Sequence, residues 1–219
     1  MRNEIKIPLS KNFNSYFNQW ANFEKKFSKP YQDRYVHSIY YDDEYFNTAL
    51  NNLTGVSNRK KFRLRWYNEK HDDVTYEIKI KKNNLGKKIS LKDKICHDTI
   101  EDLFSFKNIF LSEEKNNFFL KYIQNLDLKP KLKIDYLRSY FLYKGKIRIT
   151  YDCNINYKLF NKFSMSNFKI IDTMNIIEIK FEPHNMNLAL ELIRDSEFLP
   201  KRFSKYLRGL HLFGIVNYL

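Results

Sequence analysis

Glycine, proline and cysteine are all scarce in this sequence of 219 residues. Five glycines and five prolines fall well below the roughly 12% that the two contribute to average proteins, which excludes collagen-like and low-complexity chains. Two cysteines, Cys96 and Cys153, are too few for a disulfide scaffold and favour a reducing compartment. No apolar stretch approaches the about 20 residues that cross a bilayer, and the first ten residues lack the apolar segment of a signal peptide.

Acidic residues are outnumbered by basic ones. The 39 lysines and arginines exceed the 25 aspartates and glutamates, which gives a formal net charge of +14. Such a charge attracts polyanions, whether nucleic acids, anionic membranes, nucleotides or inorganic phosphate chains. Composition alone does not choose among these ligands, so the placement of the basic side chains has to decide.

The chain has no linker-like stretch and no internal repeat, so we expect a single domain over residues 1–219. Hydrophobic periodicity predicts strands separated by short helices. Strands are expected at Glu4–Pro8, Tyr35–Tyr41, Lys60–Tyr67, Val74–Lys81, Lys87–Leu91, Lys131–Phe141, Lys146–Asp152 and Asn175–Glu182. Helices are expected at Ser10–Phe27, with Ser10 as N-cap, and at Glu44–Leu53, Thr99–Lys107, Ser112–Asn125, Asn187–Arg194 and Ser204–Phe213.

Charged and apolar side chains alternate along several of the predicted strands. Since side chains two residues apart point to the same side of a strand, each of these strands has one charged face and one apolar or aromatic face. The charged faces carry Glu4, Lys6, Lys61, Arg63, Arg65, Glu77, Lys79, Lys146, Arg148, Glu178 and Lys180.

One alternating strand ordinarily turns its charges to water. Here the pattern repeats, and the apolar faces suit packing beneath helices, which favours a closed sheet with its charged face inside. A tunnel lined by so many cations requires a multiply charged anion to offset their repulsion. The aromatic residues lie on the faces opposite the cations, unlike a nucleic-acid-binding surface, so we expect no specific nucleic-acid partner.

Eight sequence blocks carry a family resemblance that covers nearly the whole chain. They are Ser38–Asp42 (SIYYD), Asn51–Gly55 (NNLTG), Arg59–Tyr67 (RKKFRLRWY), Tyr76–Lys79 (YEIK), Tyr136–Arg138 (YLR), Arg148–Asp152 (RITYD), Ile177–Lys180 (IEIK) and Phe203–Tyr206 (FSKY). In this order they resemble the VTC domain, the polyphosphate polymerase branch of the triphosphate tunnel (CYTH-like) superfamily. The resemblance implies an α+β fold, an eight-stranded antiparallel β-barrel (the triphosphate tunnel fold) with flanking helices.

The resemblance also implies which residues form the site. The phosphate-binding catalytic residues are expected to be Lys6, Arg63, Arg65, Lys79, Arg138, Arg148, Lys180 and Lys205. Further substrate contacts are expected from Lys88, Ser204 and Tyr206, with Lys87 open as the alternative to Lys88. Glu178, with Glu4, is the expected ligand of Mn²⁺ or Mg²⁺.

Acidic residues near these positions have structural alternatives. Glu178 and Glu4 could instead form ion pairs with neighbouring lysines. Glu77 is expected to be structural or to orient a lysine, and Asp42 and Asp152 could cap or orient strands.

The function implied by the resemblance is transfer of the γ-phosphate of ATP to a growing inorganic polyphosphate chain. The expected partners are ATP, polyphosphate and a membrane protein that takes up the product, with a cytoplasmic location that can be peripheral to an inner membrane. Triphosphate hydrolases of this fold begin with Glu-x-Glu-x-Lys, whereas this chain has Arg2, Glu4 and Lys6, which favours transfer over hydrolysis. An inorganic or nucleoside triphosphatase, and a non-catalytic polyphosphate- or nucleic-acid-binding module, stay open as alternatives.

Overall fold

The computed structural model describes residues 2–23, 27–68, 74–83, 85–93, 125–160, 168–194, 196 and 198–218. The helices predicted at Thr99–Lys107 and Ser112–Asn125 fall outside these ranges, apart from Asn125. Within the described ranges, no helix is both long enough and apolar enough to cross a membrane.

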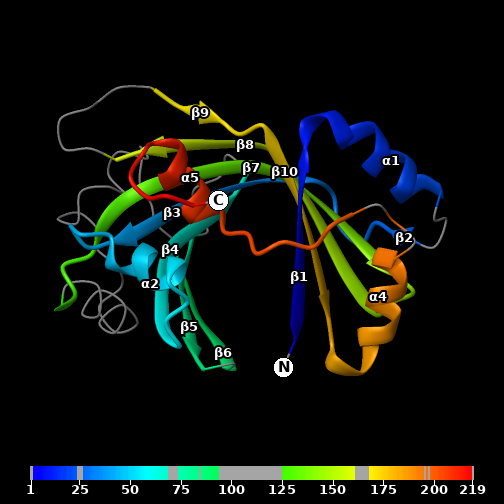
Figure 1. Cartoon of the computed structure of the whole chain (residues 1–219), viewed down its shortest axis with the longest axis horizontal. Helices are drawn as coiled ribbons and strands as arrows, with labels where there is room; N and C mark the ends of the chain where they lie inside the picture. Colours follow the sequence, from blue (N-terminus) through cyan, green and yellow to red (C-terminus); the bar gives the residue numbers. More distant parts are fainter. Residues whose placement is uncertain are drawn as a thin grey trace. The chain divides into compact units, whose positions relative to one another are not determined.

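The strands form an antiparallel sheet with the hydrogen-bonded order β1-β10-β8-β7-β3-β4-β5-β6 (Figure 1). Their bounds are β1 Asn3–Ser10, β3 Arg34–Asp42, β4 Asn58–Tyr67, β5 Val74–Lys82, β6 Leu85–Asp93, β7 Lys129–Tyr143, β8 Ile147–Leu159 and β10 Met174–Phe181. Two strands of two residues each, β2 (Phe27–Ser28) and β9 (Ile170–Ile171), pair with β7 and β8. The eight strands along this path confirm the predicted strand set.

Helices accompany the sheet and confirm the predicted α+β class. The described helices are η1 Lys11–Phe13, α1 Asn14–Phe23, α2 Asn47–Leu53, η2 Pro183–Asn185, α4 Met186–Arg194 and α5 Lys205–Leu212.

The helix predicted at Ser10–Phe27 is wrong at both ends. Ser10 is the last residue of β1 and pairs with Met174, while Phe27 belongs to β2 and pairs with Tyr143. Pairing with distant strands therefore overrides the local helical spacing at both positions. The helix predicted at Glu44–Leu53 begins later than expected, because Phe46 has a left-handed backbone (φ 58°) just before α2.

The chain divides into two compact units. The first unit comprises Met1–Tyr35, Tyr136–Asn156 and Ile171–Ser204, and the second comprises Val36–Asp135, Tyr157–Ile170 and Lys205–Leu219. Strands β3, β7 and β8 each contribute residues to both units. The single domain expected over residues 1–219 stays a prediction.

The core of the first unit is built from α1, α4 and one face of β1, β8 and β10. Phe17 of α1 stacks on Tyr151 of β8 with ring centroids 4.0 Å apart, and Leu192 of α4 is buried in the same cluster. Since these helices cover the odd-numbered side chains of the strands, the even-numbered polar side chains lie on the other face.

The core of the second unit lies on one face of β3, β4 and β5. It is formed by Ile39, Tyr41, Phe62, Leu64, Trp66, Val74, Tyr76, Ile78 and Leu128. Helix α5 packs closely against β7 and β8. A Cβ atom added at Gly209 would lie only 2.5 Å from Leu132 Cδ2 and 2.6 Å from Tyr157 Cδ1, so a larger residue would clash there. Glycine at this position lets the helix approach, and the approach fixes Lys205 and Tyr206 in its first turn.

Candidate functional site

The second unit carries basic side chains on the face of β4 opposite its core. The register forms one cross-strand row of Tyr40, Arg63 and Glu77 and another of Ser38, Arg65 and Thr75. We call the group of Tyr40, Arg63, Arg65, Glu77, Lys79, Lys88 and Lys205 the β4 cluster.

Glu77 is the acidic centre of the β4 cluster. It is 4% exposed, bonds the Arg63 guanidinium, and accepts a hydrogen bond from Lys88 Nζ at 2.6 Å. Burial would raise the pKa of Glu77, but Arg63, Arg65 and Lys88 outweigh it and lower this pKa to about 2. Glu77 is therefore an ionised counter-ion that holds basic side chains, which confirms its predicted orienting role.

The pairing of β6 with β5 places two neighbouring lysines on opposite faces of the sheet. Lys88 lies opposite Lys79, on the face that carries Glu77, whereas Lys87 lies opposite Ile80 on the other face. Of the two lysines that the sequence left open, the geometry therefore favours Lys88.

The hydroxyl group of Tyr40 interacts electrostatically with Lys205 as well as with the arginines of β4. Its hydroxyl oxygen accepts a hydrogen bond from Arg63 Nη1 at 3.2 Å. Burial would raise the pKa of Tyr40, but the charges of Arg63, Arg65 and Lys205 lower it overall. Lys205 of α5 therefore acts on the same hydroxyl group as the two arginines of β4.

Tyr206, the next residue of α5, has a different partner. Its ring stacks on Tyr40 with centroids 5.0 Å apart, and its hydroxyl donates to Asp42 Oδ2 at 2.8 Å. Asp42 also accepts from the backbone N–H groups of Thr48 and Ala49 at 2.8 and 2.9 Å, so it satisfies donors in the first turn of helix α2, whereas the sequence suggested that it caps or orients a strand. The hydroxyl of Tyr206 anchors α5 in this structure, and its contact with substrate stays a prediction.

The first unit carries a second group of charges on β1, β8 and β10. The register places Glu4 opposite Lys180 and Lys6 opposite Glu178, while Arg148 of β8 lies opposite Lys180. We call the group of Glu4, Lys6, Arg138, Arg148, Glu178 and Lys180 the β10 cluster.

Glu178 is the acidic centre of the β10 cluster. It is 8% exposed. Its carboxylate lies 2.9 Å from Lys180 Nζ, 3.6 Å from Arg138 Nη2 and 3.7 Å from Lys6 Nζ. These contacts show the ion pairs that the sequence left open for Glu178, and they leave its role as a metal ligand a prediction.

Arg138 is fixed by a buried partner. Its Nε and Nη2 donate to the two carboxylate oxygens of Asp152 at 2.5 and 2.7 Å. Burial would lower the pKa of Arg138, but Asp152 raises it well above the ordinary value. Asp152 thus orients the side chain of Arg138, whereas the sequence suggested that it caps or orients a strand.

Lys6 of β1 also contacts the segment that precedes Ser204. Lys6 Nζ donates to the carbonyl oxygen of Phe203 at 3.1 Å, which ties the residue before Ser204 to this strand. Arg148 is exposed, and Arg2 pairs with Glu182 at 3.0 Å on the surface.

A divalent cation fits the β10 cluster only together with phosphate. Among the residues the structure describes, no three His, Cys, Asp or Glu side chains gather as a metal site. Glu4 and Glu178 approach the same Lys6 Nζ, at 3.1 and 3.7 Å. Mg²⁺ often takes one or two carboxylates and completes its shell with water and phosphate oxygens, so this pair fits such a site.

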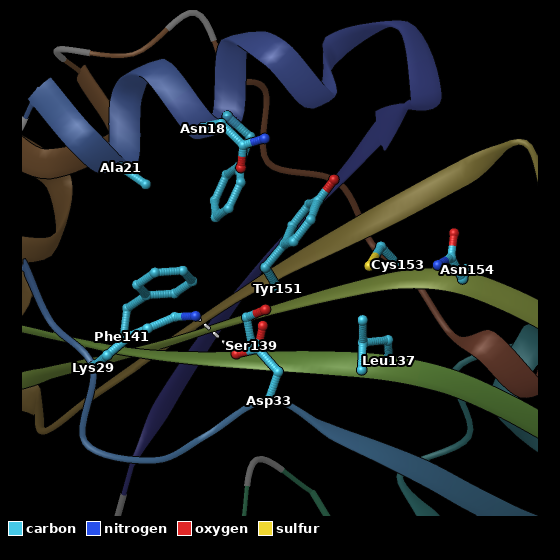
Figure 2. A pocket seen from close by; sticks show the side chains of 11 residues that line it. Asn18, Ala21, Lys29, Asp33, Leu137, Ser139, Phe141, Tyr151, Cys153 and Asn154 are labelled. Carbon is cyan, nitrogen blue, oxygen red and sulfur yellow. Dashed lines mark ion pairs between the residues drawn. The ribbon is translucent and has the colours of Figure 1, made fainter.

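A pocket of about 420 Å³ lies on the other face of the first unit (Figure 2). Aromatic rings of Phe17, Phe141 and Tyr151 line it, and its cation, Lys29, is paired with Asp33 at 3.0 Å. Burial raises the pKa of the Cys153 thiol in its wall, which keeps the sulfur protonated. The pocket therefore lacks the features of a phosphate site.

Sequence reasoning missed the roles of Tyr40 and Ser38. Tyr40 Oη and Ser38 Oγ accept hydrogen bonds from Arg63 and Arg65, and both lie on β3, directly opposite those arginines. The alternation of β3 places the two residues on one face, but the pairing register needed to match them to β4 comes from the fold.

Comparisons with known proteins agree with this architecture. A family model, the VTC domain, matches residues 3–213. A Bacillus halodurans protein provisionally named an adenylate cyclase matches with a TM-score of 0.56 and 14% identity, over 94% of each chain. A Vibrio parahaemolyticus protein with the same provisional name matches over 94% of this chain and 95% of its own, with a TM-score of 0.51 and 11% identity. At these identities the two structures show a shared fold alone.

A curated relative matches part of the chain. The ubiquitin carboxyl-terminal hydrolase UCH54 of Plasmodium falciparum is 26% identical over an alignment of 157 residues, and the match covers 67% of this chain and 32% of that protein. The match thus spans about a third of the relative's length, and the relative's name describes that longer protein.

Proposed function

The chain belongs to the VTC domain family, within the triphosphate tunnel fold that its sequence blocks predicted, and we propose that it is an ATP-dependent polyphosphate polymerase. In the proposed reaction, a terminal phosphate oxygen of polyphosphate attacks the γ-phosphorus of ATP. The bond from that phosphorus to the bridging oxygen breaks, the chain gains one phosphate, and ADP leaves. The observation that carries the proposal is the pair of cation clusters, each gathered around one buried glutamate.

The β4 cluster suits the binding of phosphate oxygens. Arg63 and Arg65 project from one face of β4, and guanidinium groups can bind phosphate through two parallel hydrogen bonds. Lys79, Lys88 and Lys205 add point charges. Each charge-assisted hydrogen bond contributes about 1.5–3 kcal/mol, and such contributions do not simply add.

The β10 cluster supplies further charge neutralisation. Lys6, Arg138 and Lys180 surround Glu178, and Arg148 lies in the next row. Glu178 and Glu4 would hold Mg²⁺ or Mn²⁺, which when bound stabilises charge on the transferred and leaving groups. Phosphoryl transfer otherwise needs positioning and charge neutralisation, so no nucleophile from the protein is required.

The residue just before β1 favours transfer over hydrolysis. A cation, Arg2, stands where hydrolases of this fold have a carboxylate, and it pairs with Glu182 at the surface. Fewer carboxylates leave less capacity to activate water. A membrane protein that takes up the product, and a cytoplasmic position beside it, belong to the same proposal.

Product analysis tests the proposal directly. We expect incubation with ATP and Mn²⁺ to give polyphosphate and ADP, resolved by gel electrophoresis and ³¹P NMR. Arg63→Ala and Glu178→Gln should each lower the rate at least tenfold, whereas Lys87→Ala, on the opposite face of β6, should not. Orthophosphate as the main product would instead indicate a triphosphatase, and binding of polyphosphate without turnover would indicate a binding module.

A further inference from the structure

Three residues of the first unit form an aromatic cluster around one arginine. The Arg34 guanidinium carbon lies 5.3 Å from the ring centroid of Tyr31 and 5.0 Å from that of Tyr140. The two rings meet edge to face, with centroids 5.6 Å apart and an interplanar angle of 77°. We call this group the Tyr31–Arg34–Tyr140 clamp.

The clamp presents an aromatic surface to solvent. Tyr31 is 59% exposed, so most of its surface lies outside any core. Its ring is nevertheless held in place, because the Arg34 guanidinium lies over it. The loop that carries Tyr31 is also closed by an ion pair at 3.0 Å between Lys29, two residues before it, and Asp33, two residues after it. An exposed ring held in one orientation can bind a flat ligand at a lower entropy cost than a mobile one.

The clamp lies next to the β10 cluster. Tyr140 follows Arg138 by two residues on β7, so their side chains share one face at a spacing of roughly 7 Å. Arg138 in turn contacts Glu178, which contacts Lys6 and Lys180. An aromatic surface and a phosphate-binding group therefore follow each other along one strand, as the base and the phosphates do in a nucleotide.

We propose that the Tyr31–Arg34–Tyr140 clamp binds the nucleobase of the nucleotide whose phosphates the β10 cluster holds; this inference rests on the proposed function. A base can stack on the exposed tyrosine, and the guanidinium adds a cation–π contact. Stacking tolerates every base, because each has a π face. ATP and GTP are therefore expected to bind with similar affinity, whereas tripolyphosphate has no base for the clamp to bind.

Titration calorimetry with ATP, GTP and tripolyphosphate tests the clamp. We expect Tyr31→Ala and Tyr140→Ala to raise the Kd for both nucleotides about tenfold and to leave the Kd for tripolyphosphate within twofold. Tyr45→Ala, a change at a tyrosine that is 77% exposed in the second unit, is the matched control and should change none of the three. Tyr31→Phe keeps the ring and should bind like the unmodified chain.

The outcomes separate the clamp from the proposed function. Equal weakening of nucleotides and tripolyphosphate, or no weakening at all, overturns the clamp while the phosphate site stands. If the unmodified chain binds neither ATP nor tripolyphosphate, both the clamp and the proposed function are overturned. If Tyr140→Ala does not fold, Tyr31→Ala decides the question, since the exposed ring of Tyr31 contributes little to the core. Selective loss of single-stranded RNA binding, with nucleotide binding unchanged, would assign the clamp to another ligand and overturn the proposal.

Discussion

Arg138 and Asp152 form a bidentate ion pair between β7 and β8, with N–O distances of 2.5 and 2.7 Å. Asp152 is fully buried, and the same guanidinium lies 3.6 Å from Glu178. The aspartate therefore fixes the arginine in the orientation that reaches the β10 cluster.

Removal of the charge of Asp152 should destabilise the fold. Asp152→Asn removes the bidentate charged partner of the buried guanidinium, and breaking a buried pair in this way costs about 3–5 kcal/mol. The unfolding free energy from urea titration measures the loss. The control is Asp33→Asn at the partly exposed Lys29 pair, where the loss should stay below about 1 kcal/mol. Equal losses in the two variants would contradict the interpretation.

Glu77 should make stability depend on pH in the acid range. Its pKa falls from 4.5 to about 2 in the folded chain, so its contribution of about 3 kcal/mol is complete above pH 4.5. The contribution is lost as the pH falls from 4.5 through 2, because protonation then favours the unfolded chain.

Glu77→Gln removes this dependence and should flatten the acid limb of stability against pH. Urea midpoints measured between pH 2 and pH 7 test the prediction. Glu191→Gln, at an exposed position of α4, is the control and should follow the unmodified chain. An acid limb in Glu77→Gln that is as steep as in the unmodified chain would contradict the assignment.

The two neighbouring lysines of β6 should differ in phosphate binding. Lys88 lies on the face of Glu77 and Lys79, and Lys87 lies on the opposite face. Lys88→Ala should weaken tripolyphosphate binding about tenfold and make its affinity less dependent on salt, since one cation fewer meets the ligand. Lys87→Ala carries the same change in net charge, so a similar loss there would indicate a general charge effect instead of a site.

The hydroxyl of Tyr206 should matter for stability more than for ligand binding. Tyr206→Phe keeps the stack on Tyr40 but removes the hydrogen bond to the buried Asp42, which should cost about 2 kcal/mol in unfolding free energy. Tyr45→Phe, at an exposed ring, should cost nothing measurable. Tripolyphosphate binding that falls tenfold at unchanged stability would instead show that the hydroxyl contacts phosphate.

Much of the charged face could be predicted because strand alternation is a local property. The spacing of Arg63 and Arg65 and that of Glu178 and Lys180 assigns each pair to one side of its strand, and the structure keeps both pairs there. The family blocks then identified the fold. Helix α4 was also predicted within one residue, since its apolar spacing is regular over its whole length.

Contacts between distant residues could not be predicted in this way. Ser10 and Phe27 suit a helix locally, and their strand pairing depends on residues far along the chain. The Tyr31–Arg34–Tyr140 clamp joins a loop residue and the first residue of β3 to β7. The pairs of Asp152 with Arg138 and of Asp42 with Tyr206 likewise depend on the fold. Sequence patterns assign side chains to faces, whereas the register between strands selects their partners.

Glu77 and Glu178 form ion pairs with the basic side chains around them. Under the proposed function, ligand binding would be an exchange in which an incoming phosphate competes with a resident carboxylate for the same N–H donors. Such competition would moderate affinity and let each bound phosphate be displaced again. A surface of this kind suits a long anion that has to advance stepwise, where a bare cationic surface would hold it in place.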